Sequence, residues 1–62
     1  MIKIERDDTV SYIAPEWINL IVIRLVKDEY WVIIFMAHGS VEYPFESLEK
    51  ANYFLEKHGL VQ

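Results

Sequence analysis

The chain has 62 residues, and its ten acidic and six basic side chains give a net charge of −4 at pH 7. It has no cysteine and only two histidines, which excludes disulfides and thiolate metal sites and argues against structural zinc. A chain this short predicts one domain, residues 1–62, whose small core commonly needs support from subunit association.

The N-terminal residues predict a short hairpin. Residues 2–5 alternate between apolar and charged side chains, as an edge strand does. Asp7-Asp8-Thr9 predicts a turn, and residues 10–13 predict the second strand.

Residues 15–27 admit two interpretations. Pro15 could open a helix, because proline is accepted in the first helical turn. The β-branched side chains that follow would crowd a helix and favour a strand. We expect a strand over 18–27, with a helix over 15–27 as the alternative.

Two turn signals predict an antiparallel meander with main strands at residues 18–27, 30–38 and 41–45. Asp28-Glu29 is expected to form the first turn, and Gly39-Ser40 the second, as a type II′ turn. Pro44 fits this arrangement because the third strand lies at the edge of the sheet.

This arrangement predicts the register and the two faces of the sheet. Ile23 is expected opposite Ile34, and Ile34 opposite Phe45. One face is uncharged and is predicted to be the internal core: Ile21, Ile23, Leu25, Val32, Ile34, Met36, Val41, Tyr43 and Phe45. The other face is apolar at its centre and holds Leu20, Val22, Arg24, Val26, Trp31, Ile33, Phe35 and Ala37, with Glu42 and Pro44.

A helix is predicted after Ser47, which is a suitable N-cap. Gly59 is expected in the left-handed position of a Schellman ending, with Leu60 packed on Leu55. The helix presents one apolar stripe, Leu48, Ala51, Phe54 and Leu55. The predicted fold class is therefore α+β: a three-stranded meander, a short N-terminal hairpin, and a C-terminal helix that covers only one face of the sheet.

The polar patterns do not indicate catalysis, a cofactor or a metal. Asp7-Asp8 lacks the spaced oxygen ligands of a calcium loop, and His38-Gly39-Ser40 has no acid placed to orient the imidazole. A nucleic-acid interface is not expected, because the bases are scattered along the sequence. They are Lys3, Arg6, Arg24, Lys27, Lys50 and Lys57.

The uncovered apolar face predicts a binding surface. Trp31 and Phe35 could stack nucleic-acid bases, but only Arg24 accompanies them, and these residue types are enriched in protein interfaces. We expect a small non-enzymatic interaction or regulatory module that forms a homodimer and binds no cofactor. Its expected interface residues are Leu20, Val22, Arg24, Trp31, Ile33 and Phe35. Tyr53 and Trp17 could mark a second contact point.

An acidic inhibitor or nucleic-acid mimic is the alternative function. Glu46, Glu49 and Glu56 lie on the predicted helix, although Lys50 and Lys57 interrupt them. The alternative predicts binding that weakens steeply with salt, whereas an apolar interface predicts little salt dependence.

The sequence also gives an expectation for location. Charged residues from Lys3 to Asp8 interrupt any apolar leader. The uncharged apolar stretches are too short to span a bilayer as a helix. Together with the absence of cysteine, this predicts a cytoplasmic protein without membrane contact.

Overall fold

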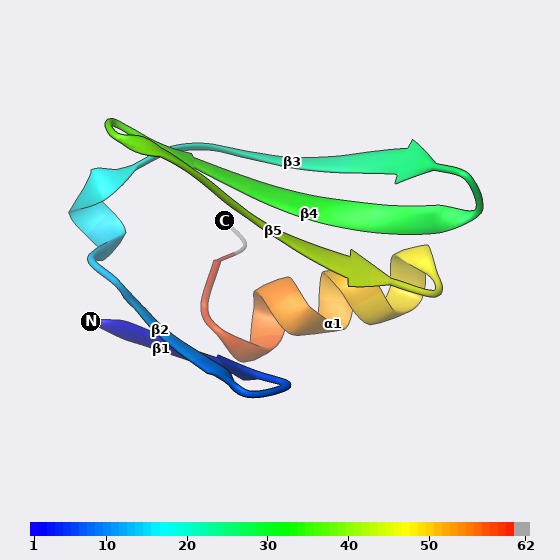
Figure 1. The fold of residues 1–62 in the computed structure, drawn as a ribbon, viewed down its shortest axis with the longest axis horizontal. Coiled ribbons are helices and arrows are strands. Elements are labelled where there is room, and N and C mark those ends of the chain that lie inside the picture. The colour runs from blue at the N-terminus through cyan, green and yellow to red at the C-terminus, as the bar shows by residue number, and fades with distance from the viewer. Residues whose placement is uncertain (61–62) are drawn as a thin grey trace.

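A computed structural model describes residues 1–60, and it confirms the α+β fold class. Val61 and Gln62, the end of the predicted domain, lie outside the described residues. A two-stranded hairpin and a three-stranded antiparallel sheet of order β3-β4-β5 enclose the helix α1 (Figure 1). The elements are β1 (Ile2–Arg6), β2 (Thr9–Ile13), the 3-10 helix η1 (Pro15–Trp17), β3 (Ile18–Val26), β4 (Glu29–Met36), β5 (Gly39–Phe45) and α1 (Leu48–Lys57).

The helical alternative for residues 15–27 is wrong, although Pro15 does open a helical turn. The turn is the 3-10 helix η1, closed by a hydrogen bond of 3.0 Å from Trp17 N to Ala14 O. The chain then becomes a strand at Ile18. The β-branched side chains after this point suit the extended backbone and stop the helix from continuing.

The first turn of the meander lies one residue earlier than predicted. Its two central residues are Lys27 and Asp28, with φ angles of 47° and 67°, and Val26 pairs with Glu29. Two consecutive positive φ angles are typical of a type I′ turn, whose twist matches that of the flanking strands. The twist preference therefore prevails over the poor fit of lysine to this conformation.

Replacing this turn by Asn-Gly (Lys27→Asn with Asp28→Gly) is expected to raise the free energy of unfolding by about 1 kcal/mol, because asparagine and glycine tolerate positive φ. Urea denaturation at fixed protein concentration measures the gain. The matched control places the same pair at Ala37-His38, a turn without positive φ, where no gain is expected. Equal effects at the two turns would contradict the type I′ assignment.

The second turn is also displaced from its predicted position. Ala37 and His38 form it, and Gly39 is the first residue of β5, paired with Met36. Gly39 has a φ of 149°, a conformation that other residues rarely adopt. Gly39 therefore lies directly after the turn and does not form its centre.

The two faces of the sheet are nevertheless as predicted. Ile23 pairs with Val32 and Ile34 with Val41, so both registers differ from the prediction by an even number of residues. An even shift leaves every side chain on its face. An irregularity between Ile18 and Leu20 lets Ile18 contact the core while Leu20 points away.

Both predicted helix ends are confirmed. The Ser47 hydroxyl accepts a hydrogen bond of 3.2 Å from Lys50 N. Gly59, at φ 67°, donates to Glu56 O, and Leu60 N donates to Leu55 O over 2.7 Å. These two bonds define the Schellman motif, which satisfies the last carbonyl groups of α1.

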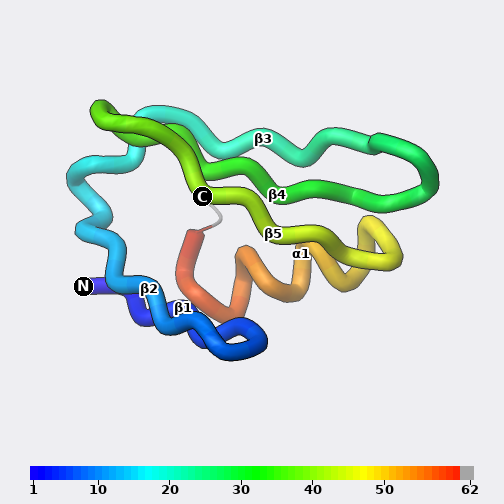
Figure 2. Tube along the Cα trace, in the orientation of Figure 1, coloured from blue at the N-terminus to red at the C-terminus, as the bar shows by residue number. Residues whose placement is uncertain are grey.

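The hairpin β1–β2 lies on the same side of the sheet as α1, so it does not cover the other face (Figure 2). Ile4 and Ile13 are buried in the core that α1 and the three-stranded sheet share. The predicted inner face and helix stripe supply most of this core, but Leu25 and Leu48 are exposed at its margin. One core therefore unites the hairpin, the three-stranded sheet and α1.

Candidate functional site

All six predicted interface residues lie on the side of β3, β4 and β5 that faces away from α1, here termed the outer face. The register places them in three cross-strand pairs, Leu20–Phe35, Val22–Ile33 and Arg24–Trp31. On β5 the same three rows end at Ser40, Glu42 and Pro44. The outer face is thus a compact grid of side chains and not a scattered set.

Ile33 lies at the centre of this grid. It is only 4% exposed, yet it does not belong to the internal core cluster. Its cover comes from its neighbours on the outer face, since the helix and the hairpin lie on the other side. A shallow depression of about 200 Å³ beside it is lined by Arg24, Val26, Trp31 and Glu42. The molecule therefore has a second apolar centre, separate from its core.

The margins of the outer face combine exposed apolar groups with two opposite charges. Leu20 is 56% and Val26 42% exposed, both on β3. Arg24 is on the edge strand β3 and Glu42 on the edge strand β5. Neither forms an ion pair with another of residues 1–60. Both charges are available to a partner.

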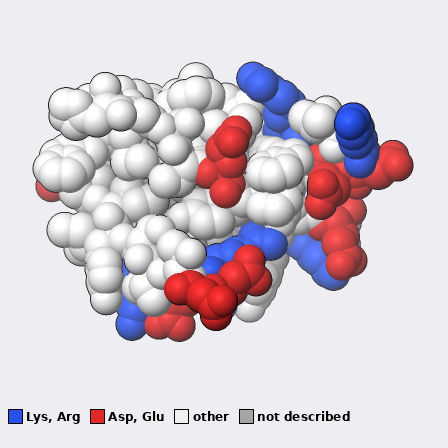
Figure 3. All heavy atoms as spheres, viewed as in Figure 1, with Lys and Arg blue, Asp and Glu red and all other residues white. Residues whose placement is uncertain are grey.

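The second suggested contact point is not assembled by the fold. Trp17 and Tyr53 are both exposed, but they line different hollows. Trp17 lies at a groove of about 540 Å³ between β2, η1 and the β4–β5 turn, and Tyr53 lies on α1. On the side seen in Figure 3, most charged side chains gather away from η1 and the β4–β5 turn, although η1 itself carries Glu16.

The polar sequences considered for chemistry remain apart from one another. Within residues 1–60, no three acidic or histidine side chains are grouped closely enough to hold a metal ion. His38 and Ser40 line the same groove beside Trp17, but no carboxylate lines it. A nucleophile, a base and an orienting acid therefore do not converge there.

The basic residues are scattered along the sequence, but they are not scattered in the structure. Four of the six, Lys3, Arg6, Lys50 and Lys57, line one hollow between β1 and α1. Only the spacing of Lys50 and Lys57, two helical turns apart, signals part of this cluster in the sequence. The approach of β1 to α1 depends on tertiary packing, which the sequence pattern did not predict.

The chain was also compared with known proteins. No protein-family model, curated protein or solved structure matches it. None of the helices within residues 1–60 has the length and apolar character needed to cross a membrane. Proposals for function therefore rest on the geometry of the outer face and of the basic hollow.

Proposed function

We propose that the protein is a small, non-enzymatic interaction module that forms a homodimer through its outer face. The observation that carries this proposal is the exposed apolar surface of the outer face, on the side of the sheet that α1 leaves uncovered, where Leu20 is 56% and Val26 42% exposed. A sheet that is apolar on both faces is normally covered on both. A second copy of the chain supplies that cover. A cytoplasmic location, predicted from the cysteine-free sequence, is part of the proposal.

The size of the outer face sets the expected affinity. Three strands of about eight residues give a footprint of roughly 25 by 15 Å, which is smaller than a standard stable interface and fits a weak one. Contiguous apolar surface of this kind commonly marks an interaction site. We therefore expect a dimer that forms at micromolar concentration and dissociates on dilution.

The two marginal charges favour one arrangement of the dimer. A two-fold axis parallel to the strands places β3 of one copy over β5 of the other, which brings each Arg24 toward the partner's Glu42. An axis perpendicular to the strands would place β3 over β3 and β5 over β5, so Arg24 would have no Glu42 opposite it. Opposite charges across an interface fix its orientation, so the first arrangement is favoured.

Charge exchange tests both the dimer and its orientation. Arg24→Glu is expected to weaken dimerisation by about 1 kcal/mol, and adding Glu42→Arg should restore it, because the pair is then exchanged and not lost. Sedimentation velocity over a dilution series measures the dissociation constants. The dimer would be ruled out if the parent chain is still monomeric at roughly 0.1 mM, which is about 100 times the expected dissociation constant. Failure of the double variant to recover would rule out only the orientation.

An acidic inhibitor of a partner enzyme is the second candidate. Since the basic hollow gathers four bases and one acid, the remaining surface carries nine acids against two bases. This segregation favours an acidic face toward a cationic partner. Such binding would weaken steeply with salt, whereas dimerisation through the outer face should change little between 50 and 500 mM salt, roughly.

A further inference from the structure

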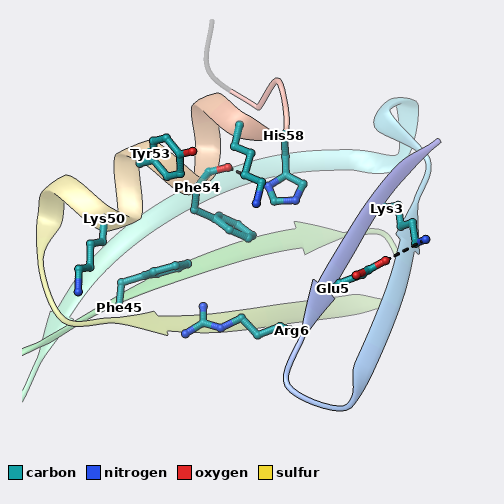
Figure 4. Close-up of a pocket in the computed structure, with 9 residues that line it drawn as sticks. Lys3, Glu5, Arg6, Phe45, Lys50, Tyr53, Phe54 and His58 are labelled. Carbon is teal, nitrogen blue, oxygen red and sulfur yellow. Dashed lines mark hydrogen bonds and ion pairs between the residues drawn. The ribbon is translucent and has the colours of Figure 1, made fainter.

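The basic hollow is the most strongly charged concavity of residues 1–60. Lys3 and Arg6 reach it from β1, and Lys50 and Lys57 from α1, around a volume of about 520 Å³ (Figure 4). Glu5 is the only acid that lines it. The cluster is notable because the whole chain carries a net charge of −4.

Ion pairs compensate only part of this charge. Lys3 Nζ lies 2.9 Å from the Glu5 carboxylate, and Lys50 Nζ lies 3.1 Å from Glu46. Both pairs are exposed, and exposed pairs open readily. Arg6 and Lys57 form no ion pair with another of the described residues. After both carboxylates are counted, the hollow keeps two positive charges.

Arg6 is held in place before any ligand arrives. Its guanidinium carbon lies 4.3 Å from the ring centroid of Phe45, and Nη2 donates a hydrogen bond to Pro44 O. Nη1 is enclosed and has no partner among residues 1–60. A stacked, partly buried arginine whose charge lacks a counter-ion supplies a fixed positive potential for anion binding.

The remaining walls are largely aromatic. Phe45 and Phe54 line the hollow, and their ring centroids are 5.0 Å apart. Tyr53 on α1, which is 65% exposed, and His58, which directly follows α1, also line the hollow. The volume is that of a small-molecule site. Cations that surround one concavity suit a compact anion with several oxygens better than an acidic peptide, whose charges are spread along a chain.

We propose that the basic hollow binds a diphosphate group, either as free pyrophosphate or as part of a nucleotide. Lys57 would contact its oxygens, and so would Lys50 once its exposed ion pair with Glu46 opens. Arg6, fixed over the Phe45 ring, and Lys3, at the β1 end of the hollow, would add positive potential. The hollow lies on the helix side of the sheet and the outer face on the other, so this site is independent of dimerisation. It is therefore an activity additional to the proposed interaction.

The test is a titration of the ¹⁵N-labelled full chain with pyrophosphate and with ADP at low ionic strength, followed by amide chemical shifts. Saturable shifts confined to β1, β5 and α1 are expected. The double variant Lys50→Gln with Lys57→Gln should weaken binding at least about tenfold, because two charge-assisted contacts are lost. Lys27→Gln is the control for a basic residue that does not line the hollow. It removes one positive charge at the β3–β4 turn, and it should change binding by less than about twofold.

Some outcomes of the titration identify the ligand, and the others overturn the proposal. Tighter binding of ADP than of pyrophosphate would support a nucleotide ligand, and equal binding would support the free diphosphate group. Shifts that do not saturate, or an equal loss in Lys27→Gln, would overturn the site. Binding of a hexaglutamate peptide without binding of pyrophosphate would assign the hollow to acidic peptides and overturn the phosphate proposal.

Discussion

Leu55→Ala is expected to lower the free energy of unfolding by about 2–5 kcal/mol, the usual cost of truncating a buried leucine. Leu55 is 6% exposed and belongs to the internal core, and its carbonyl accepts the hydrogen bond from Leu60 that closes α1. The total free energy of unfolding of a domain of this size is about 3–5 kcal/mol. The variant should therefore lose a large part of its stability, and the midpoint of its urea unfolding should fall toward zero.

Leu48→Ala is the matched control for this loss. It makes the same substitution in the same helix, but Leu48 is 46% exposed, so a loss below about 1 kcal/mol is expected. Circular dichroism during urea titration, at one protein concentration for all chains, measures both values. Equal losses in the two variants would show that α1 packs on the sheet with a different face.

Trp31→Ala is expected to weaken dimerisation by about 2 kcal/mol or more, as for an interface hot spot. Trp31 lies on the outer face opposite Arg24 and outside the internal core. The helical signal in circular dichroism should therefore be retained. Sedimentation equilibrium compares the dissociation constants of the variant and the parent.

Two further variants make the result specific. Trp17→Ala removes the other tryptophan, which is 63% exposed and away from the outer face, and should leave dimerisation unchanged. Reversing Glu46, Glu49 and Glu56 to lysine should also have little effect, because exposed charges contribute little at physiological salt. An unaffected dimer in Trp31→Ala, together with loss of a protein partner on charge reversal, would support the acidic inhibitor.

The two faces of the sheet and both ends of the helix could be predicted from the sequence because they depend on local rules. Side chains alternate along every strand, so Ile33 and Ile34 must lie on opposite faces whichever residue pairs with them. The ends of α1 depend on Ser47 and Gly59, each of which acts within a few residues.

The positions of the turns could not be predicted in the same way. Glycine favoured Gly39-Ser40 as the centre of a turn, whereas the chain turns at Ala37-His38 and uses Gly39 afterwards. At Lys27-Asp28 two non-glycine residues adopt positive φ. There the pairing of the long apolar strands fixes the loop, and tertiary structure prevails over local preference.

The basic hollow depends on contacts between residues far apart in the sequence. Arg6 and Lys57 are separated by most of the chain, and only the packing of the hairpin beside α1 brings them to one concavity. Charge counted along the sequence shows no cluster. The outer face could be predicted because each strand contributes a regular row, and a hollow between unlike elements has no such periodicity.

The irregularity in β3 disfavours the addition of further chains to this edge of the sheet. β3 is an edge strand, paired only with β4 among residues 1–60. A long apolar edge can recruit further chains and extend into a filament. The break in pairing between Ile18 and Leu20 disturbs the even spacing of edge hydrogen-bonding groups, and Arg24 adds a charge farther along. The proposed face-to-face dimer about a two-fold axis would be complete with two copies, and the interrupted edge would disfavour its extension into a filament.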